Sequence, residues 1–325
     1  TYAICKSDFL MGDENPENIK GPSSSLSEDG HQDRKFDYMI TNPPFGVSWK
    51  SDEDFVKNET KDPSGRFEAG TPRTSDGSLL FLQHLIHKME PKGSRIGIVF
   101  NGSPLFTGDA GSGESEIRKW IIENDLLECI FQLPDRMFFN TSIKTYIWIV
   151  TNKKSSDRLG KIQLIDGSSF SVSMKKNLGD KSKFIPEDKI KLLREIYLNN
   201  KENEFCKIYE NNFFGYTKVT IEQPLIKNEK IQKDKRGNTK PDSDKRIIER
   251  VPLSKDVNVY YDKEIKYHLP ESWMDRSKDK IGYEINLTQY FYKFTPLRSL
   301  KHITEELDVL DSEIKKLMLG INNGY

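Results

Sequence analysis

The chain contains 325 residues, with 50 basic and 50 acidic side chains and therefore no formal net charge at pH 7. This length fits one large domain with a smaller one, or two domains. Charged residues are abundant and no apolar run is long enough to span a bilayer, which indicates a soluble protein without a membrane segment. No basic segment followed by an apolar one opens the chain, so we expect a cytoplasmic protein and no secretion.

The cysteines and the charge balance limit the kinds of site that the chain can carry. Cys5, Cys129 and Cys206 are scattered without paired spacing, which fits a reducing compartment and predicts no zinc site. The five histidines show no metal-ligand spacing either, so we expect no metal. Zero net charge argues against a surface coated in positive charge, so contact with nucleic acid would be local or shared with a partner.

The first elements predicted along the chain are a loop, a strand and a second loop. Residues 13–35 are rich in Ser, Gly, Pro and charge, which is typical of a loop. Residues 36–41 form a short apolar run that predicts a buried strand, and the two prolines of the following tetrapeptide must end it. Residues 47–77 are again polar and predict a long loop.

Alternating helices and strands follow, and they predict a parallel α/β sheet. Apolar residues at helical spacing predict a helix over 78–90, with Asp76 as its N-cap, and further helices are predicted at 114–124 and 186–199. Strands are predicted at 95–100, 126–133, 145–151 and 161–165. The second and third of these strands are too close in sequence for a helix between them, so we expect an antiparallel strand there.

The last third of the chain divides into a charged stretch and a helical tail. Residues 225–250 have few large apolar side chains and predict a charged linker or mobile loop between a domain at 1–224 and a helical region at 251–325. A nucleic-acid patch is the alternative for this stretch. Aliphatic residues step by three and four alternately from Leu300 to Ile321, which predicts a heptad seam and a coiled coil with a helix of another chain. The alternative is a helix packed on its own domain.

The tetrapeptide Asn42, Pro43, Pro44 and Phe45 carries the most specific chemistry. It follows a predicted strand, and strand ends are where open α/β sheets place their ligands. The Asn42 side-chain oxygen and the Pro43 carbonyl can both accept hydrogen bonds from one amino group. The Phe45 ring can stack on the base that carries this group. The alternative is a Pro-Pro turn with an asparagine cap and a core phenylalanine.

Several stretches of the chain, taken in order, resemble the modification subunit of type I restriction–modification systems. They are FDYMITNPPFG at 36–46, DGSLLFLQH at 76–84, RIGIVFNGSPLFTG at 95–108, LPDRMFFNT at 133–141 and KIGYEINLTQYFYKF at 280–294. The resemblance covers most of the chain and is weakest over about residues 200–260. It implies a Rossmann-like methyltransferase sheet with a C-terminal helical tail. It also implies methyl transfer from S-adenosylmethionine to adenine N6 in DNA.

The same resemblance assigns roles to particular residues. Asn42, Pro43, Pro44 and Phe45 would form the catalytic motif, with Asn42 also next to the cofactor and Phe45 stacked on a base flipped out of the duplex.

Three further residues would line the pocket. Phe139 and Asn140 would help to close it over the flipped base, and Asn101 would line the same edge of the sheet. A hydrophobic turn and a polar turn, respectively, are the alternatives for these two segments.

The resemblance also implies partners. A DNA-specificity subunit would dock on the helix around Leu300–Leu317, a restriction subunit would join the full complex, and double-stranded DNA would be the substrate. No Walker-type phosphate loop is present, so the chain is not the motor subunit of such a system.

A glycine-rich turn after the first strand is what such a sheet uses to bring its backbone close to the cofactor. Only 41 residues precede Asn42, and the glycines among them are isolated. We therefore expect a chain that lacks the first strands and the main cofactor loop of the family. A permuted order, with the turn at residues 108–113, is the alternative.

Other functions remain open on the sequence. The same tetrapeptide is used by enzymes that methylate RNA bases or a glutamine amide, because those substrates present a similar amino group. A catalytically inactive truncated scaffold that still holds a specificity partner is the other class.

Overall fold

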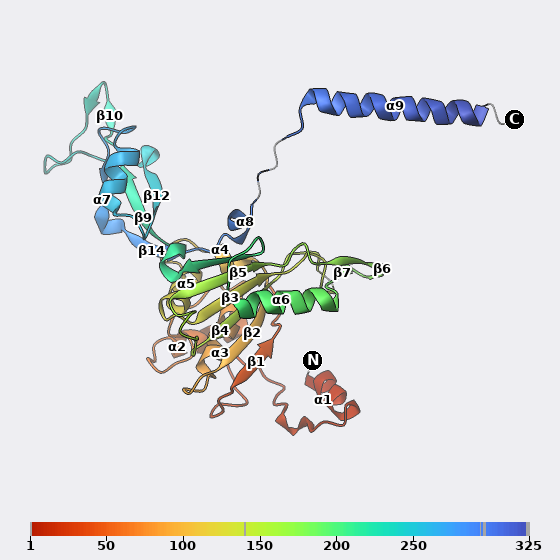
Figure 1. Cartoon of the computed structure of the whole chain (residues 1–325). Coiled ribbons are helices and arrows are strands. Elements are labelled where there is room, and N and C mark those ends of the chain that lie inside the picture. Colours follow the sequence, from red (N-terminus) through yellow and green to blue (C-terminus); the bar gives the residue numbers. More distant parts are fainter. Residues whose placement is uncertain (1, 140, 293, 295–296, 323–325) are drawn as a thin grey trace. The chain divides into compact units, whose positions relative to one another are not determined.

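The computed structural model describes residues 2–139, 141–292, 294 and 297–322. It divides into two units, Thr1–Tyr290 and Phe291–Tyr325 (Figure 1). The first unit contains the sheets and the second contains one long helix, and each is described by itself.

The main sheet of the first unit has six strands in the spatial order β1-β2-β4-β3-β5-β8 (Figure 1). They are β1 (Tyr38–Thr41), β2 (Arg95–Phe100), β3 (Leu127–Gln132), β4 (Tyr146–Thr151), β5 (Lys161–Asp166) and β8 (Cys206–Glu210). β1 is parallel to β2 and β3 is parallel to β5, whereas β4 is antiparallel to both of its neighbours. Strands β1, β2, β3 and β5 therefore all end at one edge, which we call the carboxyl edge.

The predicted alternation of helices and strands is confirmed. Helix α3 (Ser78–His87) connects β1 to β2, and α4 (Ser103–Phe106) and α5 (Gly113–Glu123) connect β2 to β3. The expected antiparallel strand is β4, which inserts between β2 and β3. Alternate residues of β2 point into a fully buried core on the side where α3 packs, because a strand turns successive side chains to opposite faces.

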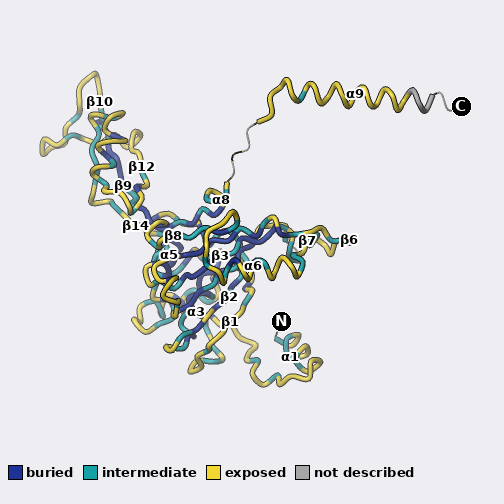
Figure 2. The backbone as a smooth tube through the Cα atoms, in the orientation of Figure 1, coloured by how far each residue is buried: buried dark blue, intermediate teal, exposed yellow. Residues whose placement is uncertain are grey.

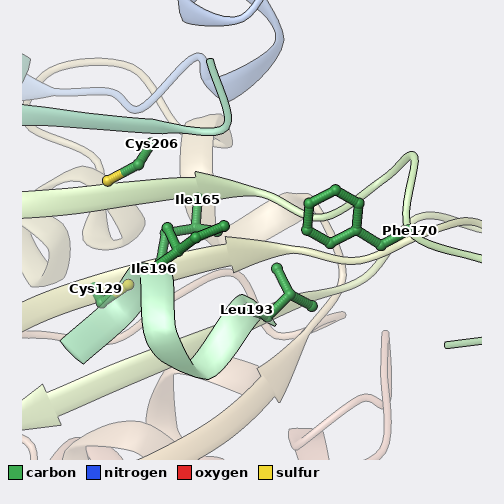
Figure 3. Packing of buried hydrophobic residues seen from close by; sticks show 6 residues of the cluster. All are labelled: Cys129, Ile165, Phe170, Leu193, Ile196 and Cys206. Atoms are coloured by element: carbon green, nitrogen blue, oxygen red, sulfur yellow. The ribbon is translucent and has the colours of Figure 1, made fainter. Parts of the chain in front are cut away.

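Helix α6 (Glu187–Asn199) covers part of the other face. Leu193 and Ile196 of this helix pack on Cys129 of β3 and Ile165 of β5, and Phe170 and Cys206 complete the cluster (Figure 3). At the far end of the sheet β1 is an edge strand, and Ile40 is 91% exposed. The strand at 36–41 is thus only half buried, because Met39 faces the core and its neighbours do not.

Residues 47–77 differ from the long loop expected from their polarity. They contain a 3-10 turn at Lys50–Asp52 and the helix α2 (Glu53–Glu59). Trp49, Val56 and Phe67 are buried in one cluster with Leu26 and Leu80. These apolar residues are few and far apart in sequence, so no periodicity signals that they share a core.

A second, smaller sheet is built around β9 (Gly215–Glu222). It pairs antiparallel with β12 (Ile247–Pro252), β13 (Trp273–Met274) and β14 (Lys280–Tyr283). The short helices α7 (Val257–Tyr260) and α8 (Leu287–Tyr290) lie before and after β13 and β14 in sequence. Residues 225–250 therefore hold a hairpin of β10 (Ile226–Lys227) and β11 (Lys230–Ile231) and most of β12, where a linker was expected. Only Val251 of β12 is buried, which explains why its sequence reads as loop.

The remaining elements of the first unit lie nearer its ends. Helix α1 (Tyr2–Met11) has no buried residue. Strands β6 (Val172–Leu178) and β7 (Lys181–Phe184) form an antiparallel hairpin between β5 and α6.

The second unit contains α9 (Leu300–Asn322), so the predicted helix is confirmed. Its seam residues Leu307, Leu310, Ile314 and Leu317 are each more than half exposed (Figure 2). No helix in the described part of the chain has the length and apolar character needed to cross a membrane.

Candidate functional site

Three of the segments singled out in the sequence leave the main sheet at its carboxyl edge. Asn42 follows the last residue of β1 and Asn101 follows the last residue of β2, and these strands are adjacent and parallel. Residues 133–139 follow β3, which runs in the same direction beyond β4. Three strand spacings, about 14 Å, separate β1 from β3. Asn140, the other predicted pocket residue, lies outside the described residues.

The tetrapeptide presents its polar end to solvent. Asn42 is exposed, Pro43 is buried, Pro44 is exposed and Phe45 is half-buried. The Asn42 side chain forms no hydrogen bond within the residues that the structure describes. Gly46 has a φ of 61°, a left-handed conformation that favours glycine, and it turns the chain away after Phe45. The motif therefore offers an unused amide oxygen and a ring held by a tight turn.

The chain after the motif is fixed by Trp49, which sequence reasoning did not identify. The Trp49 amide donates to the Thr74 carbonyl over 3.0 Å, and its indole Nε1 donates to the Arg73 carbonyl over 2.9 Å. The Gly77 amide donates to the Val47 carbonyl over 3.0 Å. These bonds tie the segment after Phe45 to the residues that lead into α3. A single tryptophan in a polar stretch was the only sequence signal for this anchor.

Arg73 extends the connection to the segment after β2. Its guanidinium donates to Ser103 Oγ over 3.1 Å, and its backbone amide donates to Glu114 Oε1 over 3.0 Å. Asn101 Oδ1 in turn accepts from the Ser103 amide over 3.0 Å. Asn101 thus uses its oxygen to cap a turn, as in the alternative considered from sequence. The N-cap of α3 is Gly77 and not Asp76 as predicted, but the Asp76 carboxylate accepts a hydrogen bond of 3.1 Å from the amide of Ser78, the first residue of the helix.

Phe139 stands at the same edge on the loop after β3. Its side chain is 59% exposed, and Lys181 Nζ lies 4.9 Å from the centre of the ring. The loop is held by the β6–β7 hairpin, because the Ser182 and Lys183 amides donate to the Arg136 carbonyl over 3.1 and 3.2 Å. A large aromatic face is therefore available to a planar ligand at this position.

Residues 108–113, the alternative cofactor turn, do not fit that role. They follow α4 and not a strand, and Ser112 caps α5. A Cβ on Gly113 would lie 1.7 Å from the Thr71 carbonyl oxygen, so the chain itself occupies the space beside this glycine. Arg118 donates to the Thr107 and Gly108 carbonyls over 2.7 and 3.3 Å. These glycines serve internal packing, and the permuted order finds no support.

A partly buried charge network joins the segment that follows the motif to helix α3. Arg66 forms two hydrogen bonds of 2.7 Å with the Glu59 carboxylate and one of 2.7 Å with the Leu26 carbonyl. Its Nη1 lies 3.0 Å from His84 Nδ1, which must accept because a guanidinium can only donate. Burial, followed by the nearby Arg66 charge, lowers the pKa of His84 to about 4. His84 is therefore neutral in the folded protein at neutral pH.

We expect this histidine to make the fold sensitive to mild acid. His84 binds a proton with a pKa near 6.5 in the unfolded chain and only near 4 in the folded chain. The contribution of neutral His84 to the free energy of unfolding is therefore fully present above pH 6.5, and it is lost as the pH falls toward 4. At pH 5 the loss is roughly 2 kcal/mol. Urea unfolding of wild type and His84→Gln at pH 7.5 and pH 5 measures it, since the glutamine does not titrate. An equal decrease in the free energy of unfolding of both proteins at pH 5 would assign the effect to carboxylates such as Glu59.

Within the part of the chain that the structure describes, no group of three or more His, Cys, Asp or Glu side chains could hold a metal ion. Burial raises the pKa of the Cys129 thiol, and the neighbouring Cys206 adds to this effect. Both cysteines belong to the packed cluster under α6.

Comparison with known proteins agrees with this architecture. Residues 1–223 match the family model described as N-6 DNA Methylase. The chain is 32% identical over 158 residues to the Type I restriction enzyme HindI methylase subunit of Haemophilus influenzae, covering 49% of this chain and 33% of that protein. It is 28% identical over 211 residues to the MjaIX methylase subunit of Methanocaldococcus jannaschii, covering 63% and 35%. The matches thus span about a third of the length of these curated relatives.

Among solved structures, a type I restriction-modification system methyltransferase subunit from Streptococcus thermophilus is similar. The TM-score is 0.54 at 21% identity, over 65% of this chain and 42% of that one. This likeness concerns the fold, and it confirms the predicted Rossmann-like methyltransferase sheet. Because the family model covers more than half of the residues, the chain belongs to the N-6 DNA methylase family, and the curated relatives that it resembles are methylase subunits of type I restriction enzymes.

Proposed function

We propose that this chain is the methylation subunit of a type I restriction–modification enzyme, acting in the cytoplasm on adenine N6 in double-stranded DNA. The observation that carries the proposal is the position of Asn42, Pro43, Pro44 and Phe45. The motif follows a strand at the carboxyl edge of a methyltransferase sheet, with its amide oxygen unused. S-adenosylmethionine, when bound, supplies the methyl group as an electrophile.

The residues of this chain would prepare the amine. The adenine amino nitrogen is a weak nucleophile because its lone pair is delocalised into the ring. Asn42 Oδ1 and the Pro43 carbonyl would each accept a hydrogen bond from one of its two N–H groups. These hydrogen bonds would draw the nitrogen toward tetrahedral geometry. The lone pair would then face the electrophile, so that catalysis is largely positioning. The base must leave the duplex first, and the loss of base stacking costs about a few kcal/mol. Stacking of the flipped base on Phe45 and Phe139 would offset part of this cost.

The other substrates of this motif and the inactive-scaffold alternative make different predictions. Radiolabelled S-adenosylmethionine, supplied to the complex of this chain with its specificity subunit, should transfer label to duplex DNA that carries the recognition sequence. An RNA of the same sequence and a glutamine-containing peptide should remain unlabelled. Label in either of these, or in none of the substrates, would overturn the proposal.

We expect that tight binding of S-adenosylmethionine requires residues beyond those named above. The space beside Gly113 is closed by Thr71, and Asn42 is the predicted cofactor neighbour that the carboxyl edge presents. We therefore expect isothermal titration calorimetry of residues 1–325 alone with S-adenosylmethionine to show no binding in the micromolar range. Micromolar binding would show that this chain forms the cofactor site by itself.

We further propose that α9 docks on a DNA-specificity subunit, and that the restriction subunit joins the same complex. The support is the exposed seam of the helix, since a row of aliphatic side chains in water favours association.

A further inference from the structure

The hairpin of β6 and β7 is a basic projection in a chain without net charge. Between Val172 and Phe184 it carries four lysines and a single aspartate. Most of its residues are exposed, and it extends beyond the body of the main sheet (Figure 1). Lys175 and Lys176 are exposed and have no ion pair within the described residues. Positive charge of this density, unneutralised by neighbours, attracts a polyanion.

The hairpin is joined to the carboxyl edge through the loop that bears Phe139. The Ser182 and Lys183 amides bond to the Arg136 carbonyl, and Lys183 Nζ lies 2.5 Å from Asp135 Oδ1. The hydrogen bond from Lys183 lowers the pKa of the Asp135 carboxyl. Lys183 and Asp135 thus neutralise one another and fasten the hairpin, whereas Lys175 and Lys176 within β6 remain available to a ligand.

Other cations lie on the neighbouring loop. Arg136 and Lys144 are exposed on the segment that links β3 to β4, and Lys181 sits over the Phe139 ring. We call Arg136, Lys144, Lys175, Lys176 and Lys181 the basic arm; these residues lie on the β6–β7 hairpin and on the segment between β3 and β4 that bears Phe139. β6 has seven residues and is thus about 23 Å long, which reaches over half a turn of a DNA duplex.

We propose that the basic arm binds phosphates of the DNA duplex beside the base held at the carboxyl edge. The proposal rests on the proposed function, because it assumes that DNA reaches this edge. Contacts of lysine with phosphate position a duplex without reading its sequence. The arm would hold the strand next to the extruded base, while sequence reading is left to the specificity subunit.

The test is DNA binding by the assembled complex with Lys175→Gln/Lys176→Gln, measured by fluorescence anisotropy over a range of salt concentrations. Each phosphate contact contributes about −0.9 to the slope of log K against log salt, so the double variant should reduce the magnitude of that slope by about 1.8. Affinity near 0.15 M salt should fall roughly ten- to thirty-fold. The loss should be similar for specific and non-specific duplexes.

The matched control is Lys92→Gln/Lys153→Gln. These lysines are exposed at the opposite edge of the sheet, before β2 and after β4, and their removal changes the net charge equally. We expect this control to bind DNA as wild type does. Equal salt slopes for wild type and both variants would overturn the proposed role of the basic arm, while leaving the proposed function intact. Loss of specificity-subunit assembly in Lys175→Gln/Lys176→Gln would also overturn it, and would assign the hairpin to a protein partner. Absence of DNA binding by the wild-type complex would instead refute the proposed function.

Discussion

Replacing Asn42 with alanine should abolish methyl transfer while the complex still assembles and binds DNA. Asn42 is exposed at the end of β1, and its side chain bonds to no described residue, so its loss should not disturb the fold. The variant removes one of two acceptors from the adenine amino group. Removal of one preorganised hydrogen-bonding group from an active site lowers turnover by about a hundredfold or more. Single-turnover transfer, with complex and S-adenosylmethionine in excess over DNA, measures this step apart from binding.

Asn101→Ala is the matched control for Asn42. It removes the same side chain at the end of the neighbouring strand, where the oxygen caps the turn at Ser103. We expect a smaller loss of transfer than for Asn42→Ala, accompanied by a lower melting temperature. Transfer near the wild-type rate in Asn42→Ala would rule out the proposed acceptor role.

Replacing Leu307 and Leu310 with aspartate should prevent assembly with the specificity subunit. Both residues belong to the seam of α9 and are more than half exposed in the second unit taken alone. If the seam is buried in a coiled coil, two carboxylates within it should weaken association by about several kcal/mol. Co-purification with the cognate specificity subunit measures the effect, beside a melting curve of the free chain.

Val309→Asp/Ser312→Asp is the control for the tail. It adds the same two charges to α9 away from the seam, at positions that are also exposed. We expect this variant to assemble normally. Normal assembly of the seam variant would exclude α9 as the docking element. A much lower melting temperature of the free seam variant would show that the helix packs on its own domain.

The main sheet could be predicted because its signals are local. Helices α3, α5 and α6 have apolar residues at helical spacing, and β4 is too close to β3 for a crossover helix. The common edge of Asn42 and Asn101 follows from the same logic, since each comes directly after a strand. Parallel strands then bring the two residues to one side of the sheet.

The parts that could not be predicted depend on contacts between distant residues. Trp49 is buried by Leu26 and Phe67, which lie far from it in sequence. In the turn at 108–113 the space beside Gly113 is closed by Thr71, a residue distant in sequence, so the glycine pattern alone could not exclude a cofactor. β12 exposes most of its side chains and is held by its pairing with β9, which leaves no alternation to detect.

The most direct test of the account is the identity of the atom that receives the methyl group. DNA carrying the recognition sequence should be incubated with the complex and isotopically labelled S-adenosylmethionine, digested to nucleosides and analysed by mass spectrometry. We expect the label in N6-methyl-2′-deoxyadenosine and in no other nucleoside, and we expect Asn42→Ala to remove it. Label on another base or another atom of adenine, or label that persists in Asn42→Ala, would contradict it.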